Sequence, residues 1–294
     1  MSEEILINVT PPETRVAVIE NGVVQEIIIE RTHNRGFVGN IYKGRVCRVL
    51  PGMQAAFVDI GLARAAFLHA SDIVGSINED QASNISDLVR EGSEIVVQVV
   101  KDPLGSKGAR LTTNLSIASR YLVFMPSLGN PGISQKIEDE DSRQELRAKI
   151  DAYVSDTPVK GNFIARTAAD GVSEETLRND MTFLCRLWAS ICERRLSQPT
   201  GNLIHEDLPL LLRAMRDLVN LDVEKIRIDS KTSWAKAREF AEKLIPDLHV
   251  QIDYYPGGRP IFDLYGVEDE IQKALERKVE LKSGGYLIID QTEA

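Results

Sequence analysis

The sequence has 294 residues, of which 43% are hydrophobic and 27% are charged, and its formal net charge is −9. This length allows two or three domains, and the composition excludes a disordered or fibrous chain. No apolar run approaches the roughly 18 residues that a membrane-spanning helix needs, so we expect no membrane association. The acidic start and three cysteines without metal-ligand spacing predict a cytoplasmic protein.

The first part of the chain is rich in predicted strands. A strand at Ile5–Thr10 is followed by Glu13–Glu20 and Val23–Ile29, which flank Asn21-Gly22, a strong hairpin signal. Five further short runs are rich in β-forming residues and separated by turn residues: Asn40–Leu50, Ala55–Ile60, Ala65–Ala70, Glu94–Lys101 and Ala109–Asn114. Five short strands within about 75 residues favour a small Greek-key barrel of the OB type.

The remainder alternates between helical and extended patterns. Helices are predicted at Ser142–Val154, Ser173–Arg195, Pro209–Val219, Thr232–Leu244 and Asp263–Glu276. Strands are predicted at Tyr121–Pro126, Asn162–Thr167, Val223–Asp229 and Val250–Tyr255, followed by a hairpin of Val279–Leu281 and Gly284–Asp290. The hairpin runs into Gln291–Ala294 without a closing element, so we expect a chain that is cut within a longer protein.

Familiar enzyme motifs do not occur in the sequence. The segment Gly105–Arg110 lacks the hydroxyl of a phosphate-binding loop, and His205-Glu206 lacks the second histidine of a zinc-protease motif. His69 lies in an apolar strand, where a hydrogen-bonded core histidine is the favoured interpretation. The residues alone therefore predict no nucleophile and no metal site.

The predicted barrel suggests nucleic-acid binding instead. Lys43, Arg45 and Arg48 interleave with apolar residues in one strand without any acid, and a local basic surface matters more than the acidic average. Phe57 and Phe67 each follow two alanines, and exposed rings on an OB strand stack on single-stranded bases. The spacing alone leaves both interpretations open and slightly favours two core rings. Two more cations, Lys107 and Arg110, would add phosphate contacts near the same surface.

Four segments resemble the bacterial ribonuclease E/G family, and ribonuclease G more than ribonuclease E: NIYKGRVCRVLPGMQAAFVDIGLARAAFLHASDI, KDPLGSKGARLTTNLSIASRYLVFMP, FIARTA and ELKSGGYLIIDQTEA. The resemblance covers the whole chain and implies an α+β fold. An RNase H-like subdomain would comprise residues 1–36 and 213–276. An S-one-type OB barrel (37–117) and a 5′-sensor (118–212) would be inserted into it. Residues 277–294 would begin a DNase I-like catalytic subdomain.

The resemblance also implies roles for individual residues. The RNA-stacking rings of the family match Phe57 and Phe67, which favours function over core, and an RNA-contacting lysine matches Lys107. Lys43 matches a position that contacts the RNA backbone. The pocket for a 5′-monophosphate matches Arg166 and Thr167, with main-chain help from Val123. A guanidinium grips a phosphate through two parallel hydrogen bonds, and a hydroxyl adds a third. One departure is Gln135, where ribonuclease E carries arginine, with Lys136 next to it.

The implied activity is Mg²⁺-dependent endonucleolytic cleavage of single-stranded RNA with a 5′-monophosphate, in RNA decay and rRNA maturation. The catalytic aspartates and the cysteine ligands of a dimer-forming Zn²⁺ would follow residue 294, so we expect this span to bind RNA without cleaving it and the longer protein to form a homo-oligomer. The alternatives are a non-catalytic RNA-binding or regulatory module, and an OB protein that binds a sugar or nucleotide.

Overall fold

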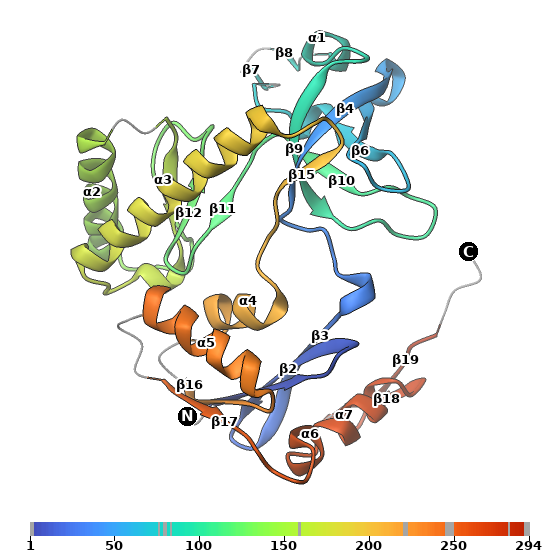
Figure 1. Cartoon of the computed structure of the whole chain (residues 1–294), viewed down its shortest axis with the longest axis vertical. Coiled ribbons are helices and arrows are strands. Elements are labelled where there is room, and N and C mark those ends of the chain that lie inside the picture. Colours follow the sequence, from blue (N-terminus) through green and yellow to red (C-terminus); the bar gives the residue numbers. More distant parts are fainter. Residues whose placement is uncertain are drawn as a thin grey trace. The chain divides into compact units, whose positions relative to one another are not determined.

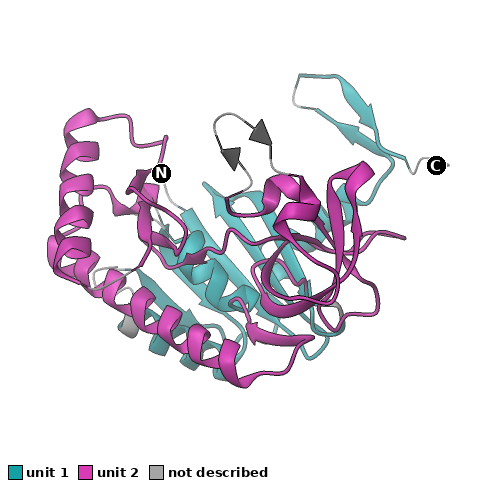
Figure 2. Cartoon of the chain, turned by 90° about the horizontal axis from the view of Figure 1, so that it is seen from above, with its two compact units in different colours: residues 1–35, 208–294 teal, residues 36–207 magenta. Residues whose placement is uncertain are grey.

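The computed structural model describes residues 3–75, 77–78, 81–82, 84–157, 160–219, 223–244, 250–281 and 283–290. The chain folds into two compact units, shown in different colours in Figure 2. Unit 1 contains residues 1–35 and 208–294, and unit 2 contains the intervening residues 36–207. The expected α+β fold class is confirmed, whereas the finer division into four subdomains stays a prediction. None of the described helices is long and apolar enough to cross a membrane.

Unit 1 is built on a mixed five-stranded sheet with the order β17-β16-β1-β2-β3. Its strands are β1 (Glu3–Val9), β2 (Glu13–Glu20), β3 (Val23–Arg31), β16 (Val223–Ile228) and β17 (Gln251–Tyr254). The first three are antiparallel, while β1, β16 and β17 run parallel. Asn21 and Gly22 have φ values of 49° and 80°, as the tight turn of a two-residue hairpin requires. The predicted hairpin is confirmed.

Helices cover both faces of this sheet. Side chains alternate along its central strand, β1, so neighbouring residues of β1 pack against different helices. Ile5 and Ile7 pack with α4 (Leu210–Asp217) and α5 (Lys231–Leu244), whereas Leu6 packs with α6 (Ile261–Leu264) and α7 (Val267–Ala274). The prediction of one helix over Asp263–Glu276 is wrong. Gly266 adopts a φ of 68°, a left-handed conformation that separates α6 from α7. A short hairpin follows, formed by β18 (Lys278–Glu280) and β19 (Tyr286–Ile288); Gln291–Ala294 lie outside the described residues.

The first part of unit 2 is a closed five-stranded barrel. Its strands are β4 (Ile41–Leu50), β5 (Ala55–Asp59), β6 (Ala66–His69), β9 (Glu94–Lys101) and β10 (Arg110–Thr112). They pair in the order β4-β5-β6-β10-β9, and β9 pairs with β4 to close the barrel. All neighbours are antiparallel except β6 and β10, which are parallel. The predicted OB-type barrel is confirmed. Shorter elements in its connections are η2 (Pro51–Met53), η3 (Ala70–Asp72), β7 (Ile77–Asn78), β8 (Gln81–Ala82) and α1 (Ile85–Leu88), whereas η1 (Thr32–Asn34) ends the first segment of unit 1.

The second part of unit 2 packs two helices against a small sheet with the order β11-β12-β14-β13. Its elements are β11 (Ile117–Ala118), β12 (Leu122–Met125), β13 (Gly132–Ile133), α2 (Glu140–Asp156), β14 (Asn162–Ala165), η4 (Thr167–Ala169) and α3 (Glu174–Ser197). Both helices begin at side-chain caps, since Asp139 accepts from Ser142 N at 2.8 Å and Ser173 from Thr176 N at 3.2 Å. The helix predicted over Ser173–Arg195 is confirmed as α3, with Ser173 as its cap.

A strand that the sequence did not predict joins these two parts. After α3 the chain forms β15 (Asn202–His205), which pairs with residues 41–43 of β4 (Figure 1). At these residues β4 pairs with β9 on its other edge, and β5 pairs only from Arg45 onward. The approach is close at Gly61, where an added Cβ would lie 2.1 Å from the Gly201 carbonyl oxygen. Gly201 N donates in turn to Lys43 O at 2.6 Å. The segment that follows α3 is therefore part of the barrel sheet, while β11, β12, β13 and β14 form a separate sheet.

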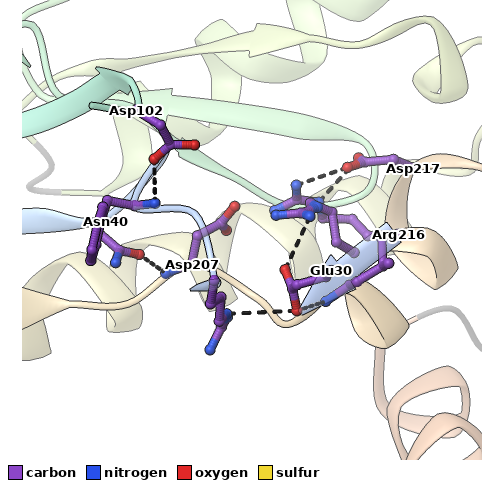
Figure 3. A network of polar contacts seen from close by, with 10 residues as sticks. Glu30, Asn40, Asp102, Asp207, Arg216 and Asp217 are labelled. Atoms are coloured by element: carbon purple, nitrogen blue, oxygen red, sulfur yellow. Dashed lines mark hydrogen bonds and ion pairs between the residues drawn. The ribbon is translucent and has the colours of Figure 1, made fainter. Parts of the chain in front are cut away.

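Polar contacts hold the chain segments near each unit's boundaries, and Figure 3 shows them from close by. Within unit 2, the Asn40 side chain accepts from Asp207 N at 2.9 Å, and the Asp102 carboxylate accepts from Phe37 N at 2.5 Å. Within unit 1, Glu30 accepts from Leu210 N at 3.0 Å. Each unit thus joins its own first and last segments.

Candidate nucleic-acid interface

Two phenylalanine rings lie next to each other on the outside of the barrel. Phe57 and Phe67 are direct cross-strand partners, and their ring centroids are 6.1 Å apart with an interplanar angle of 69°. Ala66 and Leu68, on either side of Phe67, are fully buried in the barrel interior, and the same alternation surrounds Phe57. Because strand side chains alternate between faces, both half-buried rings point outward. The structure places them outside the barrel core, and stacking on RNA stays a prediction.

Basic residues continue the line of the two rings across the barrel. Arg48 pairs in register with Phe57, Arg110 pairs with Phe67, and Lys101 pairs with Arg110. Register partners share one face of a sheet, so these five residues form a single row, which we call the outer row. Arg48 and Lys101 are exposed, whereas Arg110 is ion-paired with Asp72 at 2.9 Å. The row offers flat rings between cations, the arrangement that single-stranded nucleic acids bind.

His69 extends the aromatic surface, and the expectation that it belongs to the core is wrong. Its ring is half-buried and lies 6.4 Å from the Phe67 ring, tilted by 30°. Its Nδ1 lies 2.8 Å from Ser71 Oγ and 3.2 Å from Ser71 N, so the ring caps η3 outside the barrel interior. A spacing of two residues from Phe67 along a strand was the sequence signal for a shared face.

Lys107 lies at the tip of the hairpin between β9 and β10. Leu104 and Lys107 exchange backbone hydrogen bonds of 3.2 and 2.9 Å, and the Lys107 side chain is exposed. The hairpin is fixed to the loop between β5 and β6, because Arg64 Nη1 donates to Gly105 O at 2.5 Å. Gly108 lies so close to this loop that an added Cβ would be 2.1 Å from Ala65 O. The structure therefore holds the backbone around Lys107 in place.

Lys43 has a different environment from the outer row. Its side chain is 17% exposed, and Nζ lies 3.2 Å from Glu94 Oε2 and 3.3 Å from Gln198 O. Hydrogen bonding from Thr200 and then from Lys43 lowers the pKa of the Glu94 carboxyl below its usual value. These contacts tie the segment before β15 to the barrel. A backbone contact to RNA stays a prediction for Lys43, alongside this structural role.

Arg166 and Thr167 follow β14 at the end of the small sheet. Arg166 Nη1 donates to Ser119 O at 2.7 Å, and its backbone N donates to Tyr121 O at 2.8 Å. Thr167 is exposed, and its hydroxyl lies 3.0 Å from the hydroxyl of Ser134. The structure thus brings a guanidinium and two hydroxyls to one end of neighbouring strands. We call Ser134, Arg166 and Thr167 the strand-end site.

The other predicted sensor residue, Val123, lies within the sheet. Its register partners are Ala118 in β11 and Ile164 in β14. Ile164 is two residues before Arg166, so the main chain of Val123 is near the strand-end site without being at the strand's end. The main-chain role of Val123 stays a prediction.

The segment after β13 supplies the part of the strand-end site that sequence reasoning missed. Arg143 in α2 fixes this segment, because Nη1 donates to Ser134 O at 2.9 Å and to Ile137 O at 3.0 Å. Ser134 Oγ also lies 3.3 Å from Lys136 N. Gln135 and Lys136 are exposed beside it. The positive side chain of Lys136 therefore lies next to Gln135, the position where the resembled pattern has an arginine.

A buried carboxylate lies behind the strand-end site. Asp180 in α3 accepts a hydrogen bond from Ser119 Oγ at 2.5 Å. Burial raises the pKa of the Asp180 carboxyl to about 6, while hydrogen bonds from Ser119, Tyr121 and Leu122 and the charge of Arg166 act in the opposite direction. No sequence signal pointed to this residue, since an aspartate in an amphipathic helix is expected on the solvated face.

Metal-binding side chains are not grouped in the part of the chain that the structure describes, where no three His, Cys, Asp or Glu residues could hold an ion together. Near the C-terminal hairpin, Asp290 is ion-paired with Arg277 at 2.9 Å, and Glu293 lies outside the described residues.

Comparisons with known proteins find matches for the barrel and for the rest of the chain after it. The family model described as "Ribonuclease E/G family" matches residues 116–294, and the one described as "S1 RNA binding domain" matches residues 35–111. The chain is 54% identical to "Ribonuclease G" of Salmonella typhimurium (strain SL1344) and 53% identical to that of Escherichia coli (strain K12). Each alignment covers 100% of this chain and 61% of the relative. "Ribonuclease E" of Haemophilus influenzae is 38% identical over 99% of this chain and 32% of that protein.

Proposed function

Since this chain belongs to the ribonuclease E/G family, we propose that it is the RNA-binding and 5′-end-sensing part of a magnesium-dependent endoribonuclease that cuts single-stranded RNA. The observation that carries the proposal is the outer row, in which two adjacent rings lie between basic residues on a barrel that the S1 RNA binding domain model matches. Rings stack on bases of any sequence, and cations neutralise phosphates. Stacked bases within a duplex do not present their faces to such rings, so the surface suits single strands.

The strand-end site supports the proposed preference for a 5′-monophosphate. Arg166 provides a permanently charged, planar donor group, and Ser134 and Thr167 provide hydroxyls 3.0 Å apart. A terminal phosphate has several oxygens that accept such bonds, whereas a 5′-hydroxyl carries no charge. We infer that this site distinguishes RNA ends while the outer row holds the strand irrespective of its end.

The longer protein would supply the chemistry. The sheet of unit 1, with three antiparallel strands followed by parallel ones, supports an RNase H-like subdomain, and the C-terminal hairpin would begin the DNase I-like one. The chain spans 61% of the length of its ribonuclease G relatives. We place the ligands of Mg²⁺, those of a Zn²⁺ that links protomers into a homo-oligomer, and the cleavage step in the remainder. RNA processing of this kind, including rRNA maturation, would occur in the cytoplasm.

The proposed binding surface can be tested with 3′-labelled single-stranded RNA in fluorescence anisotropy. Phe57→Ala should weaken binding by roughly 1–3 kcal/mol, with little dependence on sequence. Phe183→Ala is the matched control, because Phe183 is a 38% exposed ring on α3, away from the outer row. Thermal unfolding of each variant shows whether it is folded. A folded Phe57→Ala protein that binds RNA like the control would refute the stacking surface, and tight binding of a mononucleotide but not of RNA would favour the nucleotide-binding alternative.

A further inference from the structure

The strand-end site is supported from behind by a carboxylate within the protein interior. Asp180 lies in α3 on the side that packs against the small sheet, and 8% of its surface is exposed. It accepts hydrogen bonds from the Ser119 hydroxyl and from the backbone N–H groups of Tyr121 and Leu122. A buried carboxylate is destabilising unless hydrogen-bond donors surround it. Three donors from one short segment meet that need.

These donors belong to a tight turn, Ser119–Leu122, which leads into β12. Ser119 N donates to Leu122 O at 2.9 Å, and Ser119 Oγ accepts from Leu122 N at 3.2 Å. The acceptors of the same turn face Arg166, since Ser119 O receives Nη1 at 2.7 Å and Tyr121 O receives the backbone N at 2.8 Å. Asp180 therefore binds the donors of a turn whose acceptors bind Arg166.

We propose that Asp180 is a positioning residue for the 5′-phosphate: it fixes the Ser119–Leu122 turn, whose carbonyl groups hold Arg166 in the orientation that receives phosphate. This inference rests on the proposed function of the strand-end site. A planar guanidinium must be aligned to form two parallel bonds to a phosphate, so its orientation decides how well it discriminates between RNA ends. The charges of Asp180 and Arg166 also attract each other, since Arg166 acts to lower the pKa of the Asp180 carboxyl.

The burial of Asp180 supports a role beyond packing. Burial raises the pKa of this carboxyl to about 6, so ionisation at neutral pH lowers the stability of the fold. A helix position that served packing alone would be better filled by an apolar residue. Carboxyls with such perturbed pKa values are concentrated at functional sites.

The test uses the 294-residue chain and two 3′-labelled single-stranded RNAs that differ in carrying a 5′-monophosphate or a 5′-hydroxyl. The measured quantity is the ratio of the two dissociation constants. For the wild type we expect discrimination of about ten-fold or more, from a charge-assisted bond. Asp180→Asn keeps the size of the side chain but replaces one carboxylate oxygen, an acceptor, by an NH2 group, a donor. This donor would face the N–H and O–H donors of the Ser119–Leu122 turn. It should remove most of the discrimination and leave the affinity for hydroxyl-ended RNA unchanged.

Coupling to Arg166 separates positioning from general stability. Arg166→Ala should abolish the discrimination, and adding Asp180→Asn to it should cause no further loss. Ser119→Ala removes one donor to Asp180 but keeps the Ser119 carbonyl, and should weaken discrimination in the same direction even if Asp180→Asn fails to fold. Asp151→Asn controls for loss of an exposed carboxylate on α2, and Tyr153→Phe for loss of another polar contact in the same core, between Tyr153 and Thr182.

Three results would overturn the proposal. Folded Asp180→Asn and Ser119→Ala proteins could keep the wild-type discrimination, Asp180→Asn could bind the monophosphate more tightly, or the losses from Asp180 and Arg166 could simply add. Tighter binding would mean that the carboxylate opposes the phosphate. If the wild type and Arg166→Ala bind both RNA ends equally, the proposed 5′-end sensing itself fails. If those two proteins differ while Asp180→Asn matches the wild type, only the role of Asp180 fails.

Discussion

Replacing Asp180 by asparagine should change how the free energy of unfolding depends on pH. The carboxyl is buried, and its pKa is raised from 3.8 to about 6 in the folded protein, with burial as the largest cause. Below pH 3.8 it carries a proton in both states. Between pH 3.8 and about 6 the folded protein retains a proton that the unfolded chain has released. The unfolded state therefore binds fewer protons in this window, and stability falls as pH rises.

The size of the effect follows from the two pKa values. They differ by about two units, and each unit corresponds to about 1.36 kcal/mol, so ionised Asp180 lowers the stability of the fold by about 3 kcal/mol above pH 6. Asparagine does not titrate. We therefore expect the stability of Asp180→Asn minus that of the wild type to increase by about 3 kcal/mol from about pH 3 to about pH 7.5.

Urea unfolding followed by tryptophan fluorescence measures this difference within unit 2. The chain has two tryptophans, and Trp188 packs beside Phe124 in the core cluster of α3. A Trp234→Phe background removes the tryptophan of unit 1, so that Trp188 alone reports. A difference that stays constant with pH would show that the Asp180 carboxyl is not shifted. A difference that decreases as pH rises would show that hydrogen bonds and Arg166 outweigh burial.

Further predictions concern the barrel and the chemistry. Gly61→Ala should strongly lower the midpoint of thermal unfolding, because φ is +82° and the new Cβ would lie 2.1 Å from Gly201 O. Gly52→Ala is the control and should be nearly neutral in the same thermal scan, since no atom lies within 4 Å of its new Cβ. Arg48→Ala and Lys101→Ala should each reduce the slope of log affinity against log salt by about 0.7 for single-stranded RNA, and an unchanged slope would remove that residue from the phosphate path. The chain should not cleave a fluorogenic single-stranded RNA in the presence of Mg²⁺, and metal-dependent cleavage that copurifies with it through successive columns would contradict our placement of the metal ligands.

Local sequence signals predicted most of the regular elements. Asn21-Gly22 predicted a hairpin because few other pairs tolerate positive φ at both positions, and both φ values are positive. Ser173 predicted the start of α3 because its hydroxyl satisfies an N–H group of the first turn. Signals of this kind depend on a few neighbouring residues, so they can be read without knowing the fold.

Features that depend on distant residues were missed. β15 has four residues and exists because β4, far away in the sequence, offers an unpaired edge. Asp180 was overlooked for a similar reason, since its donors come from Ser119–Leu122, about sixty residues earlier. The two rings were singled out from the sequence, where spacing left core and RNA-stacking roles open and the resemblance favoured stacking. Their outward orientation follows from the alternation with buried residues, which the strand register reveals.

The ends of unit 2 lie next to each other, which bears on how such a protein could have arisen. Asn40 and Asp207 are 167 positions apart and joined by a hydrogen bond of 2.9 Å, and the chain leaves unit 1 after Arg35 and returns at Leu208. A domain whose termini meet can be inserted into a surface loop of a host without stretching either partner. Unit 2 therefore has the geometry of an inserted domain, which a single recombination event could add to a host fold or exchange for another domain.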